Sequence, residues 1–117
     1  MSSFTIYHNP RCSKSRQALE LLESQGADIE VIRYLETPPD AATLVELLER
    51  LGLSARELMR KGEDTYKELN LANPELSEAQ LVQAMADYPK LIERPIVIRE
   101  GKAVIGRPPE RVLELFA

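Results

Sequence analysis

Hydrophobic and polar residues alternate near both ends of the chain and recur at helical spacing between those ends. Residues 4–7 form a short β-rich run that ends before Pro10, and residues 29–35 alternate over their whole length. Between these two runs, apolar residues recur at helical spacing within 15–24, and Gly26 is typical of a helix end. A strand, a helix and a strand of these lengths favour parallel pairing of the two strands.

The middle of the chain carries helical signals. Asp40 and the prolines before it are typical of a helix start, and Leu residues then form one apolar stripe that ends before Gly52. Ser77 and Gln80 form a capping box for a helix that ends before Pro89. Two shorter helices are predicted between them, one from Ser54 to near Gly62 and one from Asp64 to Leu71.

The last part of the chain returns to strands. Residues 96–99 and 103–105 are β-rich and flank the turn Glu100-Gly101-Lys102, so they predict an antiparallel hairpin, and residues 109–116 predict a closing helix. The order is β-α-β, a helical block at about 40–90, then β-β-α with Pro95 just before the third strand. It predicts an α/β thioredoxin-like fold, with a mixed four-stranded sheet and a central helical insertion, in a single domain over 1–117.

Composition limits the function classes. With 117 residues and 44% hydrophobic residues, the chain can bury one core. It lacks both an apolar run long enough for a membrane span and the start of a signal peptide, so we expect a cytoplasmic protein without a membrane partner. A net charge of -4 argues against a nucleic-acid partner. One cysteine and one histidine argue against a metal site.

The single cysteine lies in an unusually basic segment. Residues 1–19 contain no acid, while Arg11, Lys14 and Arg16 surround Cys12. Cys12 falls where the first strand turns into the first helix, so backbone N–H groups and the helix dipole should favour its thiolate and an incoming oxyanion. A lone cysteine is usually a buried apolar residue. The polar flank predicts instead that Cys12 is not buried, and we interpret it as a nucleophile.

The neighbours of Cys12 predict how it is recycled. Ser13 and Ser15 stand where a dithiol oxidoreductase would keep its resolving cysteine, so the segment cannot close an internal disulfide. Turnover would then require an external thiol.

Four motifs resemble the glutaredoxin-linked, ArsC-type arsenate reductases, and the resemblance runs nearly end to end. They are His8-Asn-Pro-Arg-Cys-Ser-Lys-Ser-Arg16, Tyr34-Leu35-Glu-Thr-Pro-Pro39, Arg94-Pro-Ile-Val97 and Ile105-Gly-Arg-Pro-Pro-Glu110. The resemblance implies a thioredoxin-like fold and a catalytic Cys12. It also implies no bound cofactor, and an oxyanion held by three arginines, Arg60, Arg94 and Arg107. In such enzymes the thiolate attacks arsenate, glutathione attacks the adduct, glutaredoxin removes the glutathione, and arsenite leaves.

The same resemblance suggests supporting roles, each with a structural alternative. His8 would favour the thiolate or position the loop, or it is a loop residue bonded to backbone. Ser15 would donate to the thiolate, cap the helix, or do both. Pro95 is expected to be cis and next to the cysteine.

Each of the three arginines also has a structural alternative to oxyanion binding. Arg94 could be a solvated loop residue, and Arg107 could form a structural salt bridge. Arg60 could simply favour the end of a helix dipole.

Two rival functions remain. One is an Spx-like transcriptional regulator that binds RNA polymerase, although such proteins usually carry Cys-x-x-Cys and do not require Arg107-Pro108-Pro109. The other is a monothiol glutathione-dependent oxidoreductase acting on disulfides. The typical Cys-Gly-Thr-Ser loop is replaced here by Ser13 and Lys14 after the cysteine, which bears on the choice of oxyanion.

Overall fold

A computed structural model describes residues 3–116. The chain forms two compact units, which are described separately: unit 1 is Met1–Thr37 with Arg94–Ala117, and unit 2 is Pro38–Glu93. Unit 2 covers the segment for which the sequence predicts a helical insertion. None of the helices formed within residues 3–116 is long and apolar enough to cross a membrane.

Unit 1 is built on one four-stranded sheet with the order β2-β1-β3-β4. Its strands are β1 (Phe4–Tyr7), β2 (Ile29–Ile32), β3 (Ile96–Arg99) and β4 (Lys102–Ile105). The pair β1 and β2 is parallel, whereas β3 pairs with both β1 and β4 in the antiparallel sense. The mixed sheet is the one predicted. Strand β2 ends at Ile32 rather than at Leu35, because a turn begins at Arg33. The Arg33 carbonyl accepts the N–H groups of residues 36 and 37.

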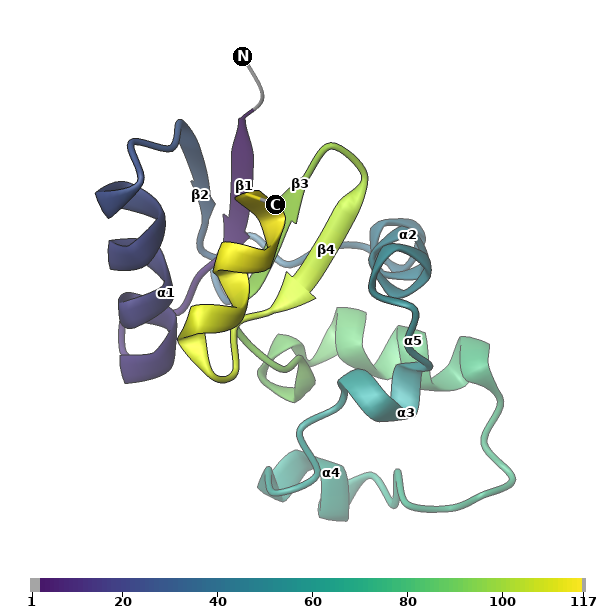
Figure 1. The fold of residues 1–117 in the computed structure, drawn as a ribbon. Coiled ribbons are helices and arrows are strands. Elements are labelled where there is room, and N and C mark those ends of the chain that lie inside the picture. The colour runs from purple at the N-terminus through teal and green to yellow at the C-terminus, as the bar shows by residue number, and fades with distance from the viewer. Residues whose placement is uncertain (1–2, 117) are drawn as a thin grey trace. The chain divides into compact units, whose positions relative to one another are not determined.

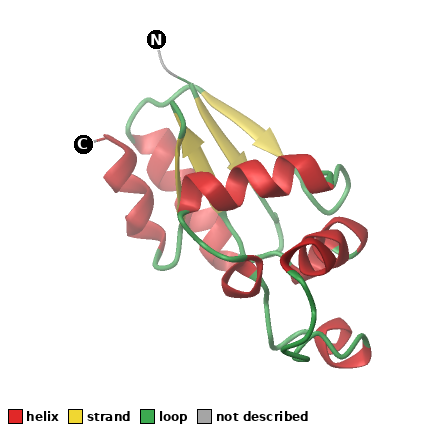
Figure 2. Cartoon of the chain, turned by 90° about the vertical axis from the view of Figure 1, so that its right-hand side faces the viewer, coloured by secondary structure: helices red, strands yellow, loops and turns green. Residues whose placement is uncertain are grey.

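Two helices lie on one face of this sheet, side by side (Figures 1 and 2). Helix α1 (Ser13–Ser24) begins at Ser13 rather than at Ser15, because Cys12 takes the N-cap position. The C-terminal helix η2 (Pro109–Phe116) forms where a helix is predicted, but it has 3₁₀ geometry. The core of unit 1 fills the space between these helices and the sheet. Its buried members are Phe4, Ile6, Ala18, Leu22, Val97, Val112 and Leu115.

The β3–β4 hairpin turns through two residues. Glu100 and Gly101 both have positive φ, 50° and 84°, as a tight primed turn requires. Lys102 therefore pairs with Arg99 and belongs to β4, whereas the sequence placed it in the turn.

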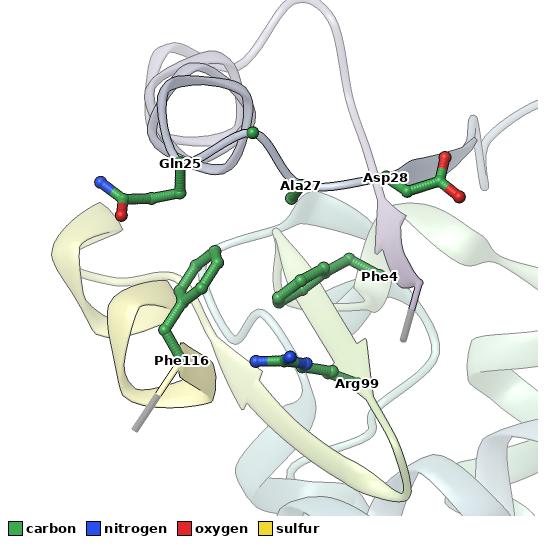
Figure 3. Close-up of a pocket in the computed structure, with 7 residues that line it drawn as sticks. Phe4, Gln25, Ala27, Asp28, Arg99 and Phe116 are labelled. Atoms are coloured by element: carbon green, nitrogen blue, oxygen red, sulfur yellow. The ribbon is translucent and has the colours of Figure 1, made fainter. Parts of the chain in front are cut away.

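Arg99 joins the end of this hairpin to the C-terminal helix. Its guanidinium lies over the rings of Phe4 and Phe116, at 4.9 Å and 5.7 Å from the centroids (Figure 3). It also donates to the Leu115 carbonyl at 2.8 Å. Phe4, Arg99 and Phe116 line a pocket at the amino end of β1, and we attribute to Arg99 a structural role there.

Unit 2 is helical. It contains α2 (Ala41–Leu51), α3 (Ala55–Leu58), α4 (Asp64–Glu68), α5 (Glu78–Asp87) and the 3₁₀ turn η1 (Pro89–Leu91). Three of the predicted starts are confirmed: the Asp40 carboxylate accepts from Thr43 N–H, and Ser54 and Ser77 each form a capping box. The fourth differs, because Glu63 takes the N-cap position of α4 that was predicted for Asp64, and no side chain caps this helix.

Two of the predicted helix ends in unit 2 are wrong. Helix α3 stops at Leu58, because Met59 turns to extended backbone and bridges Ile92. Helix α4 stops at Glu68 rather than at Leu71, because Asn70 adopts a positive φ of 54°.

Candidate active site

Cys12 stands at the junction between β1 and α1. Its backbone is extended, with φ -95° and ψ 122°, and its carbonyl accepts the Arg16 N–H at 3.0 Å. Its own N–H donates to the Asn9 carbonyl at 3.0 Å and closes a turn. At an N-cap position the first backbone N–H groups of the helix and the positive end of its dipole lie next to the residue. The predicted placement of the cysteine at a helix start is therefore confirmed.

The prediction that Cys12 is not buried is wrong. The residue is only 8% exposed, while its neighbours Arg11, Ser13, Lys14 and Arg16 are exposed. In a turn, adjacent side chains point in different directions, so a polar flank does not determine the burial of the residue in its centre.

Arg107 contacts the sulfur directly. Its Nη2 donates to Cys12 Sγ at 3.6 Å, and its Nε donates to the Arg94 carbonyl at 2.8 Å. The preceding Gly106 N–H donates to the Pro95 carbonyl at 2.9 Å. The two segments, 94–95 and 106–107, are thus fastened together beside the cysteine.

The peptide bonds on both sides of this junction are cis. The Arg94–Pro95 bond is cis as predicted, and the Arg107–Pro108 bond is also cis, which the sequence did not predict. No local sequence signal separates a cis X-Pro bond from a trans one.

His8 and Ser15 are buried residues that are hydrogen-bonded to each other beneath the cysteine loop. They are 6% and 0% exposed, and His8 Nδ1 and Ser15 Oγ are hydrogen-bonded at 2.7 Å. The Asn9 N–H also donates to Ser15 Oγ, at 3.1 Å. Ser15 therefore ties the loop to the first turn of α1. This arrangement favours the loop-positioning interpretation of His8, with a side-chain hydroxyl as its partner where the sequence analysis named backbone.

The electrostatic environment of His8 also favours a loop-positioning role. Burial lowers the pKa of His8 below its ordinary value of 6.5, and the charges of Arg33 and Arg16 lower it further. The lowered pKa favours the neutral imidazole, which supplies no positive charge to the sulfur. Arg16 also has a structural contact, since its Nη1 donates to the Pro10 carbonyl at 2.9 Å and braces the loop.

The other two predicted arginines have different surroundings. Arg94 is partly buried, and its carbonyl accepts from Arg107, as described above. Arg60 belongs to unit 2, where its guanidinium lies 2.6 Å from the carboxylate of Glu63 and 3.6 Å from that of Glu93. An oxyanion would have to compete with these carboxylates for Arg60. Oxyanion binding by the three arginines stays a prediction.

Within unit 1 the structure brings together Cys12, Arg107 and the Arg94 backbone on one side, and His8 with Ser15 on the other. Two features of the site were not predicted from the sequence: the direct contact of Arg107 with the sulfur and the charge of Arg33 near His8. The basic character of Arg33 and its place just after β2 were the only signals in the sequence for the second of these.

The fold and this loop define a class: a thioredoxin-like domain with a solitary cysteine at the N-cap position of its first helix. The model of the ArsC family matches residues 7–115. The chain belongs to the ArsC family.

Three relatives illustrate the match. The uncharacterized Escherichia coli K12 protein YfgD is 68% identical over 94% of this chain and 93% of its own length. An arsenate reductase of Neisseria meningitidis is 54% identical over 96% of this chain and 97% of its own. The solved structure of an arsenate reductase from Vibrio cholerae superposes with a TM-score of 0.95, at 56% identity, over 97% of this chain and 98% of that one.

Proposed function

We propose that this protein reduces arsenate to arsenite, with Cys12 as the nucleophile and with glutathione and glutaredoxin as external reductants. The observation that carries the proposal is the 3.6 Å contact between the Arg107 guanidinium and the Cys12 sulfur at the start of α1. A cation beside the sulfur at a helix N-terminus attracts an anionic substrate to the atom that attacks it. The family relatives named as arsenate reductases support arsenate as that anion.

The reaction begins with attack of the Cys12 sulfur on arsenic. A sulfur–arsenic bond forms, and one arsenate oxygen leaves as water after taking up the thiol proton and a solvent proton. Arg107 lies against the sulfur, where it can neutralise the oxyanion charge, and we propose that Arg94 holds another oxygen. Arsenic is still pentavalent in this adduct.

Reduction needs two further thiols, because the sequence has one cysteine. Glutathione displaces a second oxygen as water and forms a sulfur–arsenic bond. The thiol of glutaredoxin then attacks the glutathione sulfur, which leaves its electron pair on arsenic and departs as a mixed disulfide with glutaredoxin. Arsenic becomes trivalent, and water hydrolyses the remaining bond to Cys12 and releases arsenite and the free thiol. No tightly bound cofactor enters this scheme, and the need for reduced glutathione places it in the cytoplasm.

The test is arsenate-dependent oxidation of NADPH, with the purified protein, glutathione, glutaredoxin and glutathione reductase. The matched control is Cys12→Ser, because serine has nearly the same shape but its hydroxyl stays protonated at neutral pH. We expect activity in the wild type that needs both arsenate and glutaredoxin and is lost in Cys12→Ser. Full activity in that variant would exclude Cys12 as the nucleophile.

A monothiol oxidoreductase acting on disulfides is the second candidate, and the buried lone cysteine is compatible with it. It predicts glutathione-dependent disulfide exchange without any oxyanion. If the wild type performs this exchange but shows no arsenate-dependent oxidation of NADPH, disulfide exchange is the function and arsenate reduction is excluded.

A further inference from the structure

A pocket of about 200 Å³ lies beside the cysteine loop of unit 1. We call it the loop pocket. The β1–α1 loop supplies one wall and the turn after β2 supplies the other; the residues that line it are His8, Asn9, Pro10, Arg11, Arg33, Leu35 and Glu36. Both walls follow the carboxyl ends of the parallel strands β1 and β2. This is the edge of a sheet where α/β proteins bind ligands.

The loop pocket is cationic within an acidic protein. Arg11 and Arg33 are exposed, and within residues 3–116 no carboxylate lies at ion-pairing distance from either guanidinium. The field of Arg33 reaches the imidazole of His8, whose pKa it lowers in addition to the effect of burial. The only acid lining the pocket is Glu36. Two guanidinium groups and one carboxylate match the carboxylate and the ammonium group of a free amino-acid end.

Residues that line the pocket are also direct neighbours of the nucleophile in the sequence. Arg11 directly precedes Cys12, and the Cys12 N–H bonds to the carbonyl of Asn9, which lines the pocket. At about 200 Å³ the pocket is smaller than sites that enclose a whole drug-sized ligand, about 300 Å³ or more. It therefore suits one end of a short peptide whose remainder lies outside the pocket.

We propose that the loop pocket anchors the γ-glutamyl end of glutathione. Arg11 and Arg33 bind the α-carboxylate, and Glu36 meets the ammonium group. The neighbouring cysteinyl thiol is thereby presented to the group carried by Cys12. This inference rests on the proposed function for its biological meaning, because it names where the external thiol of that reaction binds. The anchoring itself involves no covalent step and does not depend on arsenate.

The experiment measures glutathione attack on Cys12 without any oxyanion. Cys12 is first converted to a mixed disulfide with 2-thiopyridine, which carries no carboxylate. An added thiol attacks the Cys12 sulfur and forms a new disulfide, and thiopyridone leaves and is followed by absorbance. Glutathione is compared with 2-mercaptoethanol, a neutral thiol without an amino-acid end, in the wild type, Arg33→Gln and Arg11→Gln. The control variant is Arg111→Gln, an exposed arginine of unit 1 that pairs with Glu114.

We expect each pocket variant to slow the reaction with glutathione about fivefold, the upper range for an exposed ion pair, and to leave the reaction with 2-mercaptoethanol unchanged. High salt should remove the difference, because it screens exposed charges. Arg111→Gln should react like the wild type with both thiols. Equal slowing with both thiols, or no slowing with glutathione, would overturn the proposal.

Two further arms separate the outcomes. Glutathione esterified at its glycine carboxylate should keep the full dependence on Arg33, and loss of that dependence would show that the glycyl end is bound instead. If the wild type shows glutathione selectivity that Arg33→Gln loses, but reduces no arsenate, the pocket assignment stands and the proposed function fails.

Discussion

Gly106 fits a space that a side chain would overfill. A Cβ atom added there would lie 2.9 Å from Pro95 Cγ, 3.2 Å from Val112 Cγ1 and 3.4 Å from Ala18 Cβ. The first two distances are shorter than ordinary contacts, and both neighbours are fully buried, so neither can swing into solvent. Forcing a methyl group into such a packed site costs about 1–3 kcal/mol. We therefore expect Gly106→Ala to lower the free energy of unfolding by that amount.

The matched control is Gly62→Ala. A Cβ atom at Gly62 would meet nothing within 4 Å, and its backbone does not have the positive φ that disfavours alanine. Alanine there should be neutral or should stabilise the protein by up to about 1 kcal/mol. Urea unfolding of the wild type and the two variants measures their free energies of unfolding. An unchanged slope of this free energy against urea concentration would show that the unfolded state is not altered.

The same substitution should disturb the chemistry. Gly106 bonds to the Pro95 carbonyl and precedes Arg107, so a shift away from Pro95 moves the guanidinium that contacts Cys12. Gly106→Ala should consequently slow alkylation of Cys12 by iodoacetamide, whereas Gly62→Ala should not. Equal unfolding free energies for the two variants would refute the packing argument.

Two further predictions concern the cysteine loop. Because burial lowers the pKa of His8 below 6.5, the unfolded state binds more protons than the folded one at mildly acidic pH, and stability should fall as pH drops below 6.5. His8 is the single histidine, so His8→Gln should flatten this part of the pH profile of unfolding; an unchanged slope would contradict the assignment. Arg107→Gln should slow Cys12 alkylation at pH 7 about fivefold, because the lost guanidinium faces the sulfur. Arg111→Gln, on an exposed site, serves as its control and should alkylate at the wild-type rate.

The contact of Arg107 with the sulfur changes one expectation from the sequence. From the sequence, the arginines were expected to bind the oxyanion, and the start of the helix was expected to activate the thiol. With Nη2 at 3.6 Å from Sγ, one guanidinium is placed to serve both purposes. Loss of thiol reactivity in Arg107→Gln would therefore agree with the structure, and it would not count against an oxyanion role.

Local sequence signals predicted most of the secondary structure because those signals act over a few residues. The caps at Asp40, Ser54 and Ser77 form from residues three positions apart, and the helix start at each of them was predicted correctly. One helix end was missed because a distant partner decides the conformation. Met59 leaves α3 to bridge Ile92, more than thirty positions later in the sequence.

The sequence by itself determined the order of strands and helices, the mixed sheet and the position of a solitary cysteine at the first helix start. Periodicity, caps and turn residues are enough for these, because each is a property of neighbouring positions. Only the tertiary structure decided that Cys12 is buried, that Arg107 reaches its sulfur from 95 positions away, and that burial and the charge of Arg33 lower the pKa of His8. Burial and electrostatic fields sum over everything packed around an atom, and most of those atoms lie far away along the chain.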